Sequence, residues 1–223
     1  MSIWQRIAGA VQDVGDSITG YFGSTTPPEK SIAFTIGMIA LGAKMARADG
    51  AVTRDEVAAF GQVFQVPEKD QPAVQRVFDL AKQDIAGFES YATQVAGLFA
   101  PGSDMLENVL DGLFHIAKAD GAVHEDELTF LERTAELFGF DQKAFSRIRA
   151  RHVLIADDPY EILGVAADMP FEDIRKAHRK LVRELHPDKH VASGMPSELI
   201  LIATERLARI NEAFDRIKKE AKA

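Results

Sequence analysis

The sequence predicts an all-α protein with two helical domains, and three observations support that fold class. A 14-residue motif occurs twice in the first two thirds of the chain, each time where an apolar segment with helical spacing ends. Near the C-terminus, two long amphipathic segments are joined by a loop of about a dozen residues, as in an antiparallel helical hairpin. Residues 158–223 hold 12 acidic and 12 basic side chains, so residues 1–157 carry the whole net charge of −8. We therefore expect an N-terminal segment at 1–28 and domains at 29–152 and 158–223.

The composition excludes several kinds of site. The 223 residues include no cysteine, which rules out disulfides, thiolate zinc sites and a cysteine nucleophile, and fits a reducing compartment. Apolar residues make up 46% of the chain, enough for a packed core in each domain. A net charge of −8 argues against a general nucleic-acid binder, because phosphates are bound by basic surfaces. No nucleic-acid partner is expected.

Residues 1–28 are predicted to be an amphipathic segment and not a secretory signal. No basic stretch precedes an apolar one, and apolar side chains recur at helical spacing: Ile3, Ile7, Val11, Val14, Ile18 and Phe22. The uncharged, largely apolar run at 31–43 has 13 residues and is too short to cross a bilayer. We expect a cytoplasmic protein whose first segment packs on its own domain or on a partner. Peripheral attachment to the cytoplasmic face of the inner membrane is the alternative.

The duplicated motif predicts two helix–turn–helix corners. Two segments are identical at eight positions with a constant offset of 71 residues: KMARADGAVTRDEV at 44–57 and HIAKADGAVHEDEL at 115–128. Gly50 and Gly121 suit the left-handed conformation that ends a helix. Thr53 and Glu56 have the spacing of a capping box, so the next helix is expected to start there. In the second copy, His124 takes the cap position.

The corners raise the question of a metal site. Their Asp-Gly, Val and Glu fall where the second half of an EF-hand calcium loop would place them, but the expected first and third ligand positions hold non-ligands. A calcium ion takes about six to eight oxygens, so one corner cannot hold it alone. Two hypotheses stay open. Either a divalent cation is shared by both corners, or each Asp makes a turn and each Glu caps a helix; the residues concerned are Asp49, Glu56, Asp120 and Glu127.

The C-terminal domain is predicted to contain a short helix followed by the helical hairpin. Asp158 and Pro159 suit the first positions of a helix, which ends at Gly164. Pro170 opens the second helix and Pro187 ends it. That helix has a stripe formed by Ile174, His178, Leu181 and Leu185, and a basic face formed by Arg175, Lys176, Arg179, Lys180 and Arg183. The third helix carries apolar side chains three and four apart: Ile200, Ala203, Leu207, Ile210, Phe214 and Ile217.

The triplet His186-Pro187-Asp188 lies at the predicted tip of the hairpin, beside the basic face. A metal or hydrolytic site there would use the side chains of His186 and Asp188 together with those of His178 and His190. However, His178 lies on the apolar stripe, and His186 and His190 straddle a proline, so these two do not share a helix face. A docking loop at the end of a basic helix fits the position better.

The duplicated corners resemble the TerB family of tellurite-resistance-associated helical domains. The resemblance covers about residues 30–150 and lies in the alanine-Asp-Gly corner, followed by an apolar and then an acidic residue, in each half. It implies a compact helical interaction domain with acidic surface residues that suggest metal binding, and it implies no catalysis.

The C-terminal domain resembles the J-domain of DnaJ-type co-chaperones over about residues 158–220. The motifs are DPYEILGV, IRKAHRKLVRELHPDKH and the late run INEAF. The resemblance implies that the domain recruits a DnaK-type chaperone ATPase and triggers its ATP hydrolysis through His186, Pro187 and Asp188. Matching positions of the positive docking surface are Arg175, Arg179, Lys180 and Lys189, and we assign Lys176 and Arg183 to the same surface. His178 departs from the family, which usually has Tyr.

The order of the two domains and the loop VASGMPSELILIATERLA resemble the DjlA family of bacterial co-chaperones. Its relatives have an N-terminal membrane anchor, and membrane attachment is not carried over to this chain. We expect a co-chaperone without enzymatic activity, whose TerB-like domain binds an unidentified protein client. The alternatives are a metal-stress or envelope-stress sensor that uses the acidic corners, which a cation titration would reveal, and a metallohydrolase, which would require a bound transition metal.

Overall fold

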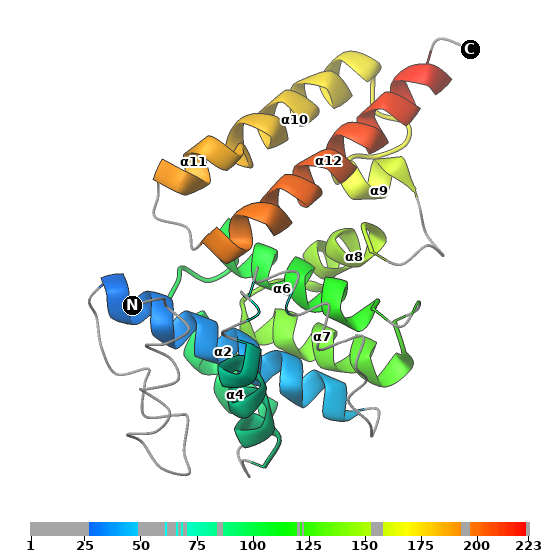
Figure 1. Ribbon diagram of the computed structural model, residues 1–223. Helices are drawn as coiled ribbons and strands as arrows, with labels where there is room; N and C mark the ends of the chain where they lie inside the picture. The colour runs from blue at the N-terminus through cyan, green and yellow to red at the C-terminus, as the bar shows by residue number, and fades with distance from the viewer. Residues whose placement is uncertain are drawn as a thin grey trace.

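The computed structural model describes residues 27–48, 61, 66, 68, 71–83, 87–119, 121, 123–152, 158–192 and 197–221. Within these residues the chain forms helices and no strand, which confirms the predicted all-α class (Figure 1). The helices, in chain order, are α2 (Pro27–Ala48), α4 (Gln71–Gln83), α5 (Phe88–Ala96), α6 (Asp104–Ala117), α7 (Glu125–Leu137), α8 (Gln142–Ala150), α9 (Pro159–Leu163), α10 (Phe171–Glu184), α11 (Pro187–Ala192) and α12 (Ser197–Glu220).

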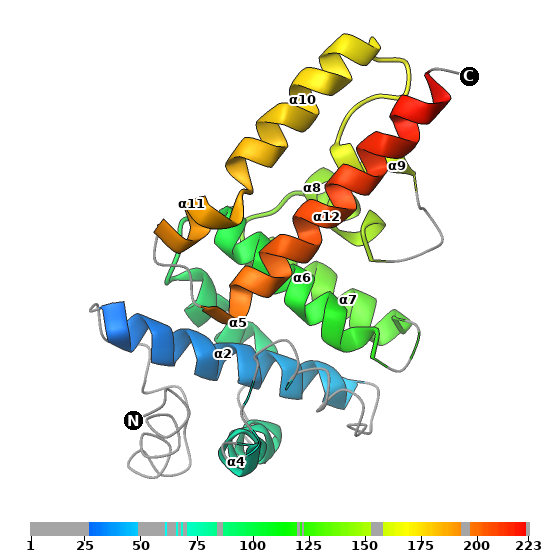
Figure 2. The same cartoon turned by 45° about the horizontal axis from the view of Figure 1, so that its top comes forward.

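Helix α2 lies at the centre of the N-terminal domain. Its side chains from Ala33 to Met45 are buried, except for the half-buried Lys44. Helices α4, α5, α6 and α7 all pack against it, with α4 on the side away from α6 (Figures 1 and 2). A helix that is apolar all round is one that is buried all round. The part of the uncharged run from 33 to 43 is therefore core. No helix among the described residues is long and apolar enough to cross a membrane.

The second copy of the repeat forms the corner between α6 and α7. Gly121 has a φ of 117°, a positive value that side-chain-bearing residues rarely adopt, as its predicted role requires. His124 is the N-cap of α7, and its backbone N–H donates to Glu127 Oε2 at 2.8 Å. Glu127 thus caps the helix as one of the two hypotheses expects. The first corner, with Gly50 and Thr53, lies outside the described residues.

The C-terminal domain has the predicted short helix and hairpin. The Asp158 side chain accepts a hydrogen bond from the Tyr160 backbone N–H at 2.9 Å, and Gly164 ends α9 in the left-handed conformation with a φ of 67°. Helices α10 and α12 then run antiparallel beside each other (Figures 1 and 2). Their shared core with α9 is made of Ile162, Leu163, Ile174, Leu185, Ile210, Ala213 and Ile217.

The connection between α10 and α12 differs from the predicted loop because it contains a helix. Pro187 does end α10, but it also begins the six-residue helix α11. Proline suits the first turn of a helix, where its missing N–H has no intrahelical partner. The sequence interpretation considered only the effect of the proline on the helix before it.

Helix α12 belongs to both cores. Ile210 and Ile217, in its second half, pack in the hairpin core, whereas Ile202 and Ala203, near its start, are buried in the core of the N-terminal domain. In return, Ala150 at the end of α8 packs with the hairpin core. The apolar side chains of α12, which were predicted to pack only within the hairpin, therefore pack in the cores of two domains.

We predict that Ile174→Ala, which truncates a side chain that is 2% exposed in the hairpin core, lowers the free energy of unfolding by about 2–5 kcal/mol. The half-buried Val182, on the same helix, is the control, since Val182→Ala should cost distinctly less. Chemical denaturation followed by circular dichroism measures both. Equal losses would mean that the hairpin core is not where the structure places it.

Candidate partner-docking site

The predicted basic face lies on the surface of α10, but its first side chains are engaged by acids. Arg175 Nη2 lies 2.6 Å from Glu172 Oε2, and Lys176 Nζ lies 2.9 Å from Asp173 Oδ1. The hydrogen bond to Asp173 raises the pKa of Lys176. These acids occupy the first turn of α10, where they also suit the helix dipole. A partner that used this end of the helix would have to compete with them.

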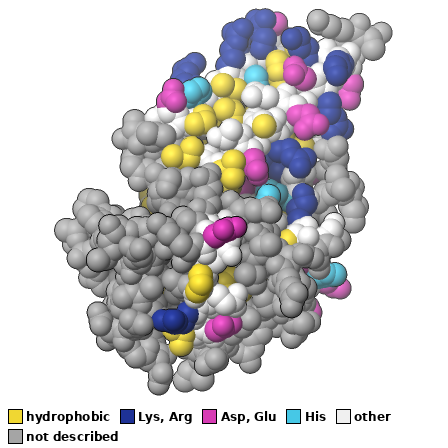
Figure 3. Space-filling view, in the orientation of Figure 1, with side chains coloured by type: hydrophobic (Ala, Val, Ile, Leu, Met, Phe, Trp, Pro, Cys, Tyr) yellow, Lys and Arg dark blue, Asp and Glu magenta, His cyan; other side chains and the backbone are white. Residues whose placement is uncertain are grey.

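The basic side chains nearest to the triplet are free of such acids. Arg179, Arg183 and Lys189 are exposed and form no ion pair with any described residue, while Lys180 Nζ lies 4.0 Å from Glu184 Oε1. Figure 3 shows Lys and Arg side chains gathered over the part of the molecule that α10 and α12 form. Among the free cations, Arg183 lies three residues before the triplet and Lys189 directly after it, so an acidic partner at the triplet would meet positive charge directly.

The triplet is exposed but anchored. Leu185, immediately before it, is 2% exposed and donates its backbone N–H to the Leu181 carbonyl at 2.9 Å. The side chains of His186 and Asp188 are 52% and 91% exposed. His186 Nδ1 accepts the Asp188 backbone N–H at 3.3 Å, and the His186 carbonyl accepts the Lys189 N–H at 3.0 Å. The imidazole thus sits at the start of α11, so the tip has a defined shape although its side chains face solvent.

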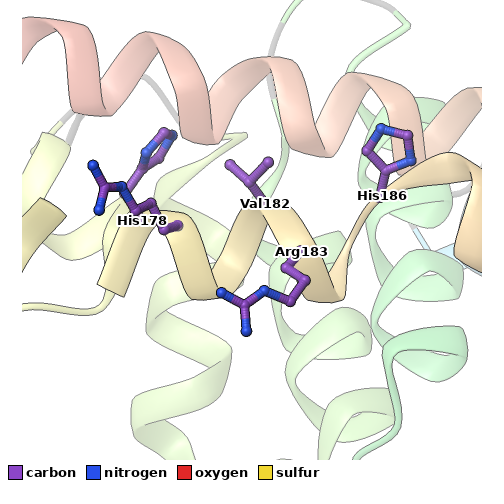
Figure 4. A pocket seen from close by; sticks show the side chains of 5 residues that line it. His178, Val182, Arg183 and His186 are labelled. Carbon is purple, nitrogen blue, oxygen red and sulfur yellow. The ribbon is translucent and has the colours of Figure 1, made fainter. Parts of the chain in front are cut away.

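A shallow groove of about 310 Å³ runs along α10 to the triplet. Its lining residues are His178, Arg179, Val182, Arg183 and His186. In Figure 4, His178, Val182 and His186 lie along one side of α10, and Arg183 projects from the other. The groove therefore offers an apolar strip bordered by cations, with the triplet histidine at one end.

His178, at the other end of the groove, holds α10 against α12. Its ring stacks on Phe214 with centroids 4.0 Å apart and planes within 4°, and its Nε2 lies 2.9 Å from Asn211 Oδ1. The prediction that this histidine lies on the inner stripe of α10 agrees with these contacts. Here it takes the place of the usual tyrosine by stacking and by hydrogen bonding across the hairpin.

The predicted metal ligands are not brought together within the described residues. Asp49, Glu56 and Asp120 lie outside them, and the Glu127 carboxylate accepts the hydrogen bond that caps α7. Among the described residues, no group of three or more His, Asp or Glu side chains is arranged to hold a metal ion. A cation shared by the two corners stays a prediction.

The sequence interpretation missed a buried charge cluster formed by Glu107, Asp111, Arg151 and Arg206. The two carboxylates lie one turn apart on α6, and each is 3% exposed. Arg151 Nη2 lies 2.9 Å from Glu107 Oε1 and 2.9 Å from Asp111 Oδ1, and Arg206 Nη2, from α12, lies 2.7 Å from Glu107 Oε2. The signal in the sequence was the pair of acids four residues apart in the apolar helix DMLENVLDGLFHIA.

Opposite charges within the cluster shift the pKa values of Asp111 and Arg151. Burial raises the pKa of Asp111, but Arg151, the hydrogen bond from His152 and Arg206 together hold it well below its ordinary range. Burial lowers the pKa of Arg151, yet Asp111 and Glu107 raise it above its usual value. Asp111 and Arg151 therefore stay charged at any physiological pH.

His152, at the edge of the charge cluster, stays neutral. Its Nε2 lies 2.6 Å from Asp111 Oδ1, and its ring stacks on Phe114 with centroids 4.8 Å apart. Burial lowers its pKa below 6.5, and repulsion by Arg151 and Lys118 adds to that effect, while the hydrogen bond and charge of Asp111 oppose it. The neutral ring donates its Nε2–H to the carboxylate.

Comparison with known proteins identifies two regions of the chain. The family described as tellurite resistance protein TerB matches residues 35–150, and the DnaJ domain matches residues 158–223. Relatives named Co-chaperone protein DjlA are similar over most of their length. The protein from Photobacterium profundum is 26% identical over 90% of this chain and 83% of its own. The one from Coxiella burnetii is 28% identical over 78% and 73%. No solved structure gave a match.

The lowered pKa of His152 predicts a pH dependence of stability. The unfolded chain binds a proton near the ordinary pKa of 6.5 and the folded chain resists it, so the free energy of unfolding should fall as pH drops through 6.5. Melting temperatures between about pH 7.5 and about pH 5.5 measure this. His152→Gln should show a weaker dependence than the wild type. Parallel curves for the two proteins would show that His152 does not carry the effect.

Proposed function

Because the chain belongs to the TerB family over more than half of its length and carries a DnaJ domain after it, it is a J-domain co-chaperone, and we propose that it recruits a DnaK-type chaperone and stimulates its ATP hydrolysis. One arrangement carries the proposal. His186 and Asp188 are exposed and directly follow the buried Leu185. The free cations Arg179 and Arg183 precede them on α10.

Each part of this arrangement has a separate task in the proposal. Arg179, Arg183 and Lys189 attract an acidic surface of the ATPase and orient the hairpin on it, because charge complementarity chiefly sets encounter rate and register. The groove between His178 and His186 then supplies apolar contact. The triplet engages after that: the His186 imidazole, which accepts the Asp188 backbone N–H, and the exposed Asp188 carboxylate meet polar groups of the partner that control hydrolysis.

We further propose that the TerB domain delivers the chaperone to specific protein clients. It lies within residues 1–157, which carry the whole net charge of −8, so it differs electrostatically from the hairpin and suits a different partner. The chain has no Gly/Phe-rich segment and, without cysteine, no zinc ribbon. General capture of unfolded chains is therefore a less suitable task for it than binding of particular clients. The site of action that we propose is the cytoplasm.

The first functional prediction concerns the triplet. His186→Gln and Asp188→Asn should each abolish stimulation of a DnaK-type ATPase in single-turnover assays, because each removes a group that the partner must meet. Both side chains are exposed, so the free energy of unfolding should change by less than about 0.5 kcal/mol.

Asp168→Asn is the matched control for the triplet variants. It removes an exposed carboxylate between α9 and α10, away from the triplet, and should retain full stimulation. Full stimulation by Asp188→Asn would refute the co-chaperone mechanism proposed here. If that variant unfolded, the triplet would have a structural role instead.

The second functional prediction concerns the free cations. Arg179→Glu combined with Arg183→Glu should weaken binding to the ATPase, and added salt should weaken binding of the wild type, since exposed charges are screened beyond about 8 Å at physiological ionic strength. Binding measured over a salt series tests both expectations. Lys143→Glu combined with Arg149→Glu makes the same change in net charge on α8 and should have little effect. An equal loss in both double variants would mean that only net charge matters.

A further inference from the structure

One side chain of the hairpin enters the N-terminal domain. Arg206 projects from the first half of α12 and is 6% exposed. Its Nη2 lies 2.7 Å from Glu107 Oε2, its Nη1 donates to Asn108 Oδ1 at 3.3 Å, and its Nε lies 3.9 Å from Asp111 Oδ2. Its Nη2 also lies 3.9 Å from a third acid, Asp104 Oδ1, and all four partners are on α6. The contact therefore joins the two domains through a buried ion pair and a hydrogen bond.

The charged site on α6 that binds Arg206 is formed by residues of the N-terminal domain, without a contribution from α12. Arg151, from α8 of the same domain, already binds both Glu107 and Asp111. Arg147, also on α8, lies 3.6 Å from Glu107 but is only half-buried, so within their own domain the two buried carboxylates face a single fully buried guanidinium. A buried charge without a buried partner is costly. The guanidinium of Arg206 supplies the second fully buried partner.

Apolar contacts place Arg206 at this pocket. Ile202 and Ala203, four and three residues earlier on α12, lie on the same face of the helix and are 3% and 1% exposed. Gly112 on α6 makes room for them: a Cβ at Gly112 would lie 2.7 Å from Ile202 Cδ1. The absence of a side chain there lets the two helices approach closely.

A second contact lies between α8 and α9. Ala150, at the end of α8, packs with the hairpin core, and a Cβ at Gly164 would lie 3.2 Å from Arg147 Cδ. Arg147 Nη2 in turn lies 3.6 Å from Glu107 Oε2, so this contact reaches the same charge cluster. Two separate attachments prevent the hairpin from turning about a single point.

The attached side of the hairpin is opposite to the docking side. Figures 1 and 2 show α12 between α10 and the N-terminal domain, so α10 lies on the far side of α12 from α6. The basic face and the triplet remain available while α12 is held. Attachment and docking can therefore occur together.

We propose that Glu107 and Asp111 form a receptor for Arg206, and that this contact clasps the J-domain to the TerB domain as one rigid unit in solution with its triplet free. The clasp deepens the proposed function by fixing the triplet at one position relative to the client-binding domain. It does not depend on the identity of the ATPase or of the client.

Paired labels test the clasp directly. The chain has no cysteine, so Lys143→Cys on α8 and Lys219→Cys near the end of α12, outside the docking surface, give two unique, exposed attachment sites in the full-length protein. Spin labels there report the distance between domains by pulsed electron resonance. We expect one narrow distribution for the otherwise unchanged protein. Arg206→Glu places a third carboxylate in the receptor and should give a broad distribution that extends to longer distances.

Two comparisons make the outcome decisive. Arg209→Glu makes the same charge change on the exposed side of α12 and should keep the narrow distribution. Ile202→Asp disrupts the apolar part of the same contact and should broaden it. Helix content and ATPase stimulation should survive in every variant, because neither the hairpin core nor the triplet is changed. A broad distribution in the parent, a narrow one in Arg206→Glu, or loss of the hairpin's helices in Arg206→Glu would each overturn the clasp. Loss of stimulation in the parent alone would instead count against the proposed function.

Discussion

Two carboxylates buried one turn apart on α6 are the constraint on which the relation between the two domains depends. Within their own domain, Glu107 and Asp111 are met by the buried guanidinium of Arg151 and, at 3.6 Å from Glu107, by the half-buried Arg147, both from α8. The second fully buried guanidinium comes from Arg206, which belongs to the hairpin, and removing one partner of a buried ion pair is strongly unfavourable. A buried carboxylate of one domain is thus paired with a side chain of the other, and the position of α12 follows from it.

Such a cluster contributes more to fixing the position of α12 on α6 than to the net free energy of unfolding. Burial and the neighbouring Arg151 lower the pKa of Arg206 despite the three acids around it, so its charge is held at a cost. Buried ion pairs often contribute little net stability, while removing one partner is strongly unfavourable. The apolar contact of Ile202 beside Gly112 contributes attraction, and the ion pairs decide the one register at which α12 can lie. The triplet then takes a definite place at the other face of the hairpin.

Much of this architecture was predictable from local patterns. The apolar spacing of α10 and α12, the cap at Asp158 and the left-handed Gly164 all depend on neighbours in sequence, and the structure has each of them. The division of α12 was not predictable in this way. Ile202 and Ile217 look alike in a periodic stripe, and only the position of α6, distant in sequence, decides which core receives them.

At the docking site, the triplet and the basic helix were visible in the sequence, because proline and charge act locally. The pairing of Arg175 with Glu172 is also local, at a spacing of three residues on one helix, but the sequence interpretation did not use that spacing to separate paired from free cations. Helix α11 was missed because Pro187 both ends one helix and begins another.

The central claim is that one helix serves two cores, and amide hydrogen exchange along α12 in the full-length chain tests it most directly. If Ile202, Ala203 and Arg206 are held by α6, amides in the first half of α12 should exchange as slowly as those around Ile210 and Ile217. Fast exchange confined to the first half, with the second half protected, would contradict the account, because it would leave α12 attached to the hairpin alone.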